Sequence, residues 1–396
     1  MSDVRFEDKL AEISQWYCDV ESRSLGVAES LVELCDRLLA AGSQIWRIRI
    51  IRLTQHPQLK GTVFWWETGQ PLRVLPASHQ ANESEYYVNS PIDWSTRHKK
   101  RLRLDLTDPA SIERFPQLKD FVEGGGTDYI AQPLVLADSR VSCLTLATQA
   151  PGGFREAEIA FLDQVLPMIS TRIDVQSLQH ALRSLLSAYL GPNAAQRVLN
   201  GQFKRGDGEL IEAALWFADL RGFTKLSDGR EPTEVVKILD SYFDVMVNAV
   251  ERFGGEVLKF MGDGILAIFP AVPSSQDAGT RAVAAAEAAH HGLEAQAHER
   301  TDLPELRAGV GIHFGEVMYG NVGSGTRLDF TVIGRAVNQA ARIEAMSKPL
   351  GCPTLLSREV ATLLPADKVV DLGMHTLRGV SGEQRLYRPE TDEAGG

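Results

Sequence analysis

The sequence contains little cysteine, with only four in 396 residues: Cys18, Cys35, Cys143 and Cys352. They lie far apart and include no Cys-x-x-Cys pair, which excludes a disulfide framework and the ligand spacing of a zinc site. The first eight residues lack the apolar core of a signal peptide, and no uncharged apolar run is long enough to span a bilayer. We therefore expect a soluble, cytoplasmic protein without membrane insertion.

An excess of basic residues is also absent. The chain has 41 Lys and Arg residues against 52 Asp and Glu residues, a formal net charge of −11, which argues against nucleic acid or an anionic membrane as the main partner. The hydrophobic share of 44% and the charged share of 23% are ordinary for a globular protein and exclude wholesale disorder. The length predicts two or three domains.

The first half of the chain has the element order of a small α+β module. Apolar residues at helical spacing predict helices over residues 5–42, and residues 45–51, 62–66, 129–137 and 141–148 are typical of strands. Residues 76–91 are rich in turn formers. This order of elements resembles GAF-type ligand-sensing domains, without a diagnostic ligand motif. The resemblance implies a GAF-like regulatory domain over residues 1–175; the alternative is a packing or dimerisation domain with no ligand.

A single strongly basic run covers residues 97–104. Arg101 and Arg103 alternate with Leu102 and Leu104, which predicts a strand that shows its charges to water on one face. The alternative is a site for an anion or for nucleic acid.

A long apolar stripe runs from Glu156 to Tyr189 at helical spacing. Such a helix is either part of a core or a parallel dimer helix that joins a sensor to an output domain. We expect residues 176–210 to be a helical linker or transducer, with the glycine-containing stretch 197–209 as its end, and residues 390–396 to be a disordered tail.

Two aspartates in the second half lie at the ends of predicted strands. Residues 213–218 form an apolar run typical of a fully buried strand, and Asp219 ends it. Asp263 lies in a Gly-Asp-Gly hairpin turn, four residues after Lys259. Since one helix over residues 232–253 joins these elements, both carboxylates can converge at one sheet edge and hold two Mg²⁺ ions. Taken singly, an aspartate such as Asp219 is more often a helix-cap or turn residue, and Asp263 alone would be a solvated aspartate in a hairpin turn.

A third motif joins a strand at residues 330–333 to a helix at about residues 336–346, through Gly334. Asn338 and Arg342 are four positions apart, so their side chains leave the helix on one face. An amide and a guanidinium placed in this way can hold a ribose oxygen and a phosphate oxygen together. The alternative is ordinary exposed helix surface.

Three ordered motifs in residues 211–389 resemble the catalytic domain of class III nucleotidyl cyclases. They are Phe217-Ala-Asp-Leu-Arg-Gly-Phe-Thr, Gly254-Gly-Glu-Val-Leu-Lys-Phe-Met-Gly-Asp-Gly and Phe330-Thr-Val-Ile-Gly-Arg-Ala-Val-Asn-Gln-Ala-Ala-Arg. The resemblance implies an α+β fold, in which a ferredoxin-like βαββαβ core carries an added C-terminal hairpin. It also implies head-to-tail homodimers in which the metal ligands of one subunit face the nucleotide-binding residues of the other.

The same resemblance assigns a role to each matching position. Asp219, Asp263 and the Leu220 carbonyl would bind two ions, Mg²⁺ or Mn²⁺. The nucleotide would be bound by Lys259 and Thr331 at the purine, Asn338 at the ribose, Arg342 at the reacting phosphate and Arg378 at the triphosphate.

The pair Lys259 and Thr331 resembles that of a bicarbonate-responsive adenylyl subgroup, which implies bicarbonate as a possible regulator. A lysine ammonium donates to adenine N1 and a threonine hydroxyl accepts from N6, whereas the N1–H of guanine would oppose a donor. We therefore expect an adenylate cyclase that converts ATP to 3′,5′-cyclic AMP and pyrophosphate, under the control of its N-terminal domain. The alternatives are a guanylate cyclase and a catalytically silent module that binds nucleotide or dimerises.

Overall fold

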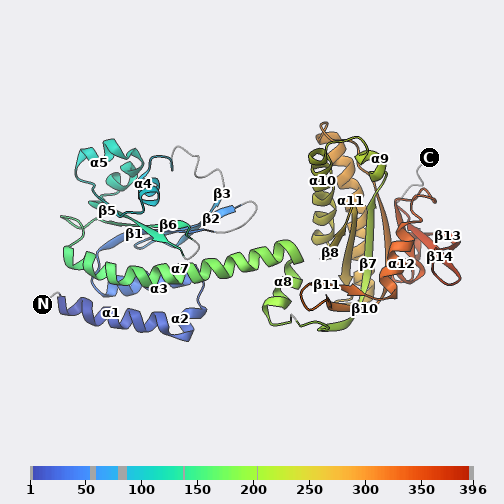
Figure 1. The fold of residues 1–396 in the computed structure, drawn as a ribbon, viewed down its shortest axis with the longest axis horizontal. Helices are drawn as coiled ribbons and strands as arrows, with labels where there is room; N and C mark the ends of the chain where they lie inside the picture. The colour runs from blue at the N-terminus through green and yellow to red at the C-terminus, as the bar shows by residue number, and fades with distance from the viewer. Residues whose placement is uncertain (1–2, 54–58, 79–86, 137–138, 203, 392–396) are drawn as a thin grey trace. The chain divides into compact units, whose positions relative to one another are not determined.

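The computed structural model describes residues 3–53, 59–78, 87–136, 139–202 and 204–391. The chain divides into two compact units, Met1–Leu185 and Leu186–Gly396 (Figure 1). Of the predicted tail, residues 392–396 lie outside the described part. Among the described residues, no helix combines the length and the apolar composition needed to cross a membrane. All four cysteines are free thiols.

The first unit is built on an antiparallel sheet in which every predicted strand is present. Its order is β3-β2-β1-β6-β5-β4. The strands are β1 (Ile45–Leu53), β2 (Leu59–Glu67), β3 (Arg73–Ser78), β4 (Leu102–Asp105), β5 (Asp128–Val135) and β6 (Val141–Thr148). Residues 76–78 were predicted as part of a turn-rich segment, but they belong to β3, because they pair with β2. Residues 79–86 of that segment lie outside the description.

Helices cover both faces of this sheet. One face packs against α1 (Asp3–Cys18), α3 (Val27–Ala40) and α7 (Glu156–Leu190), with Ile48, Phe64 and Leu144 among the buried contacts. Short α2 (Val20–Ser24) connects α1 to α3. The opposite face packs against α4 (Pro91–His98), η2 (Pro116–Leu118) and α6 (Lys119–Glu123). Helix α5 (Pro109–Arg114) precedes η2 in the chain.

Only the end of the basic run forms the predicted strand, because Arg97 and His98 belong to α4 and β4 begins at Leu102. In β4, Leu102 and Leu104 are buried while Arg103 is turned outward. Arg103 Nη2 donates to Asp128 Oδ2 at 2.8 Å and Nη1 donates to Glu156 at 2.9 Å. Arg101, which directly precedes β4, forms an ion pair with Asp163 of α7. These pairs give both arginines a carboxylate partner within the chain.

The second unit contains a larger mixed sheet of order β13-β14-β12-β10-β7-β9-β8, with β11 on the end of β10. Its first six principal elements run strand, helix, strand, strand, helix, strand. They are β7 (Gly208–Leu220), α10 (Pro232–Arg252), β8 (Glu256–Met261), β9 (Gly264–Pro270), α11 (Ser275–Glu299) and β10 (Ala308–Gly323). The later elements are β11 (Leu328–Ile333), α12 (Arg335–Glu344), β12 (Thr354–Ser357), α13 (Arg358–Ala361), η3 (Ala366–Lys368), β13 (Val369–Thr376) and β14 (Glu383–Pro389). The predicted C-terminal hairpin is confirmed, since β13 and β14 pair antiparallel.

The helices α10 and α11 bury one face of this sheet around Trp216, Tyr242 and Phe269, all fully buried. The other face packs against α8 (Pro192–Leu199), β11 and α12. The helix predicted from Glu156 to Tyr189 is confirmed as α7. Residues 197–209 were predicted as the end of the linker, but the segment between helix and strand is shorter than this, because α8 extends to Leu199 and β7 begins at Gly208.

Candidate active site

Two carboxylates meet at one end of the large sheet. Asp219 lies at the end of β7, which pairs with β9 through Ala218 and Ile265. Asp263 occupies the turn between β8 and β9, where Gly262 adopts a positive φ of 69° that favours glycine. Burial, together with the neighbouring Asp263 carboxylate, raises the pKa of Asp219 to about 6. The convergence of these two side chains, predicted from the sequence, is thus present in the fold.

A third carboxylate, which the sequence did not reveal, lies beside this pair. Glu344, at the end of α12, has its pKa raised to about 7 by burial and by the charge of Asp219, while a hydrogen bond from Ser347 opposes the rise. Arg221 also lies near, but its Nη2 donates to the backbone carbonyls of Ser347 and Cys352 at 3.2 and 2.7 Å. Within the described ranges, no three His, Cys, Asp or Glu side chains are arranged as a metal-binding group. Asp219 and Asp263 are thus a pair of neighbouring carboxylates, and Leu220 adjoins Asp219 in the chain.

Lys259 and Thr331 belong to strands that contact each other, β8 and β11. The Nζ of Lys259, on β8, donates to Asp329 Oδ2 on β11 at 2.8 Å, and this contact lowers the pKa of Asp329. Thr331 follows two residues later on β11 and is nearly buried, paired with Gly320 of β10. Lys259, Asp329 and the adjacent Phe330 line a cavity of about 600 Å³. The Lys259–Asp329 ion pair had no signal in the sequence.

Asn338 and Arg342 lie on the exposed face of α12, as their spacing predicted. The opposite face of the helix buries Ala336, Ala340 and Ile343. In the described part of the chain, no hydrogen bond or ion pair holds Asn338 or Arg342. Arg378 is exposed as well, in the turn between β13 and β14.

By the roles expected from the sequence, the site residues form two groups: Asp219 and Asp263 for cations, and Lys259, Thr331, Asn338, Arg342 and Arg378 for the nucleotide. The structure brings the two aspartates together, and the strands β8 and β11 that carry Lys259 and Thr331 contact each other. Asn338 and Arg342 share the exposed face of α12, whereas Arg378 lies in the turn between β13 and β14. Among the residues that the structure describes, no hydrogen bond or ion pair links the first group to the second.

Residues 209–387 match the family described as adenylate and guanylate cyclase catalytic domain. This segment is therefore similar to adenylate and guanylate cyclase catalytic domains. Every residue of both groups, from Asp219 to Arg378, lies inside the matched range.

Three similar proteins illustrate the relationship. An uncharacterised protein of Mycobacterium tuberculosis is 35% identical over 214 residues, 52% of this chain and 38% of that protein. An adenylate cyclase of Anabaena cylindrica is 39% identical over 151 residues, 36% of this chain and 29% of that protein. The solved structure of the adenylyl cyclase CyaB from P. aeruginosa is 29% identical with a TM-score of 0.43, over 48% of this chain and 99% of that one. The chain spans well under half the length of these two curated relatives.

In the segment that matches the cyclase family, Gly311 determines how closely α12 approaches the sheet. A Cβ at this position would lie 2.3 Å from the Glu344 backbone nitrogen and 2.6 Å from the Ala340 carbonyl oxygen. We expect Gly311→Ala to lower the unfolding free energy by about 2–4 kcal/mol, because backbone atoms cannot yield as a flexible side chain can. Thermal unfolding monitored by circular dichroism measures this. Gly325→Ala is the matched control, since a Cβ there meets nothing within 4 Å; equal melting temperatures for the two variants would contradict the prediction.

Proposed function

We propose that the chain is an adenylate cyclase, which converts ATP to 3′,5′-cyclic AMP and pyrophosphate at two equivalent sites between the subunits of a homodimer. The observation that carries the proposal is the convergence of Asp219 and Asp263 within residues 209–387, the segment that matches the adenylate and guanylate cyclase catalytic domain. The core that holds them would be the ferredoxin-like βαββαβ fold of class III cyclases. The proposal includes ATP as the substrate, the homodimer and the role of each site residue.

The aspartate pair fits a cation. Two carboxylates close enough to raise the pKa of Asp219 repel each other when both are ionised, and oxygen ligands of this kind suit Mg²⁺ and Mn²⁺. When bound, two such ions would supply charge neutralisation for the triphosphate and activation of the ribose 3′-hydroxyl. Asp219 and Asp263 would hold them, with the Leu220 carbonyl as a further oxygen ligand.

The second group of residues would bind and orient ATP. Lys259 would donate to adenine N1 and Thr331 would accept from N6, with Asp329 holding the ammonium in place as it does in the free chain. Asn338 would orient the ribose. Arg342 would stabilise the charge that develops on the α-phosphate, and Arg378 would bind the triphosphate.

Exposed apolar side chains support the homodimer. Phe260, Met261 and Ile333 are each 40% to 51% exposed and lie on β8 and β11, next to Asp263 and Thr331. A second stripe runs along α7, where Val175, Leu178, Leu182 and Leu185 are exposed at the alternating three- and four-residue spacing of a coiled-coil seam. A second copy of the chain would cover both surfaces and bring the two groups of site residues together.

We further propose that the first unit is a GAF-like regulatory domain. Its central antiparallel sheet, with helices on both faces and α7 leading out of it, supports this. We also propose bicarbonate as a regulator, and the basis for this is only the resemblance of the Lys259 and Thr331 pair to that of the bicarbonate-responsive adenylyl subgroup.

The direct test is turnover by the purified full chain with Mg²⁺ or Mn²⁺ and either ATP or GTP, with the cyclic product identified by mass spectrometry. We expect cyclic AMP from ATP. Cyclic GMP as the main product would contradict the assignment of Lys259 and Thr331. Absence of both products would contradict the proposed activity of the chain as it stands.

Arg342→Ala is expected to lower kcat by about 10²–10³-fold with a smaller change in KM, since this guanidinium would act mainly on charge that develops in the transition state. Arg335→Ala is the matched control, because Arg335 is an exposed arginine on the same helix. An Arg342→Ala protein with the kcat of the control would remove the assigned role.

A further inference from the structure

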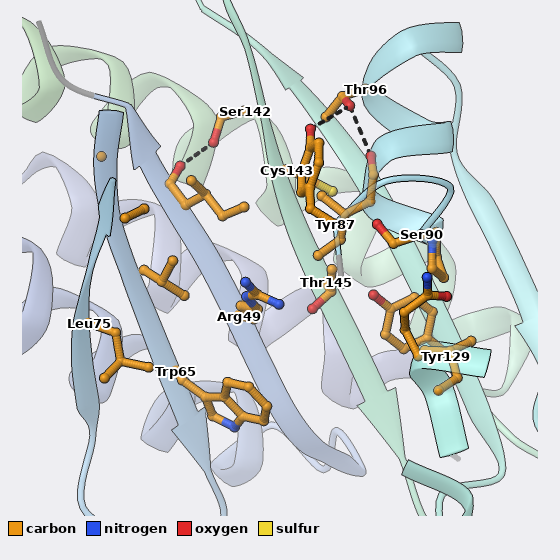
Figure 2. A pocket seen from close by; sticks show the side chains of 18 of the residues that line it. Arg49, Trp65, Leu75, Tyr87, Ser90, Thr96, Tyr129, Ser142, Cys143 and Thr145 are labelled. Atoms are coloured by element: carbon orange, nitrogen blue, oxygen red, sulfur yellow. Dashed lines mark hydrogen bonds between the residues drawn. The ribbon is translucent and has the colours of Figure 1, made fainter. Parts of the chain in front are cut away.

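The first unit contains a cavity of about 390 Å³ between its sheet and the helices that follow β3 in the chain. Figure 2 shows its wall, with the side chains of Arg49, Trp65 and Thr145 next to one another on the sheet and Tyr129, on β5 of the same sheet, to the right of them. Apart from a few polar groups, the lining is apolar and aromatic. A volume of this size suits a small organic molecule.

Arg49 is the charged group in this wall, and its position is fixed by the sheet. On β1 it pairs with Trp65 of β2 on one side and with Thr145 of β6 on the other. Since cross-strand partners point to the same face, all three side chains are directed to the cavity. The guanidinium also lies 5.8 Å from the centre of the Trp65 ring.

The described residues provide no carboxylate for Arg49. Arg47, two positions earlier on the same strand and face, is paired with Glu67 at 3.1 Å. Within the described residues, Arg49 has no such ion pair, and its Nε is buried without a hydrogen-bond partner. A guanidinium is always charged at physiological pH, and placing it in an apolar wall without a counter-ion is unfavourable.

Two further polar atoms of the same wall are unsatisfied in the part of the chain described. The indole Nε1 of Trp65 is a buried donor without an acceptor, and Gln117 Oε1 is a buried acceptor without a donor. Buried polar atoms nearly always have partners in folded proteins. Three unsatisfied polar atoms around one cavity indicate a site whose partners come from a ligand.

We propose that this cavity binds a small organic acid, whose oxyanion pairs with Arg49 and whose aromatic or apolar body lies against Trp65 and Tyr129. A carboxylate and a phosphate share the bidentate geometry that a guanidinium recognises. The cavity is built only from residues of the first unit. The inference thus goes beyond the proposed cyclase activity and is independent of it.

The test is calorimetric titration of the full chain, without ATP or metal ions, with three probes that share one ring system: 1-naphthoate, 1-naphthyl phosphate and neutral 1-naphthamide. We expect at least one acid to bind, and the amide to bind at least about tenfold more weakly. The stronger acid identifies the oxyanion that the site prefers. Binding of amide and acids with equal affinity, or no acid binding below about 10 mM, would overturn the proposal.

Arg49→Gln is expected to weaken binding of the preferred acid by at least about tenfold, whereas Arg47→Gln, which removes a paired guanidinium from the same strand, leaves it within about threefold. Because the unpaired charge disfavours folding, the melting temperature of ligand-free Arg49→Gln is expected to equal or exceed that of the parent chain. Should Arg49→Gln fail to fold, Arg49→Lys provides the second variant, with intermediate affinity expected because the charge remains and the planar donors are lost. Parent-like affinity in either Arg49 variant would overturn the proposal.

Discussion

Replacement of Asp263 by asparagine is expected to lower the kcat of ATP cyclisation by about a thousandfold or more. The amide keeps the shape of the side chain but removes the negative charge that would hold the cations next to Asp219. The same change is expected to raise the melting temperature of the metal-free protein, because it removes the charge that raises the pKa of Asp219. Activity and stability would thus change in opposite directions.

The measurement pairs a product assay at saturating Mg²⁺ or Mn²⁺ with a thermal melt in the presence of a chelator. Asp240→Asn, an exposed aspartate on α10 of the same unit, is the matched control and should leave both quantities unchanged. A purely structural role for Asp263 predicts a lower melting temperature instead. Activity within a few-fold of the control would contradict the assignment of Asp263 as a metal ligand.

The aspartate pair could be predicted from the sequence because each aspartate is positioned by local structure. An apolar run ends at Asp219, and glycines flank Asp263 in a hairpin turn; both signals lie within a few residues of the side chain. The same reasoning predicted the exposed face of α12, since the spacing of Asn338 and Arg342 is a property of one helix.

The rest depends on strands and helices that are distant in the sequence. Lys259 and Asp329 are 70 positions apart and meet because β11 folds back beside β8. Glu344 reaches Asp219 because α12 packs closely on β10 at Gly311. At Arg49 the sequence predicted only a strand; that the described residues offer it no carboxylate depends on which residues β2 and β6 place beside it. None of these contacts can be predicted from the residues next to each side chain in the sequence.

A heterodimer of two inactive variants is expected to recover about half of the parent activity per dimer. In the proposed arrangement, each site takes its aspartates from one subunit and Arg342 from the other. An Asp219→Ala subunit paired with an Arg342→Ala subunit therefore has one site with both defects and one site with none. Each homodimer of either variant has two defective sites.

Co-expression with two different affinity tags and sequential purification would isolate this heterodimer, and cyclic AMP formation would measure it. The matched control pairs Asp219→Ala with Asp263→Ala. Both changes lie in the aspartate pair, so every site in that heterodimer keeps one defect and no activity should return. Recovery in the first pair and not in the second can arise only if the two halves of a site belong to different subunits. Absence of activity in both pairs is the result expected if each chain completes its own site, and it would contradict the homodimer as proposed.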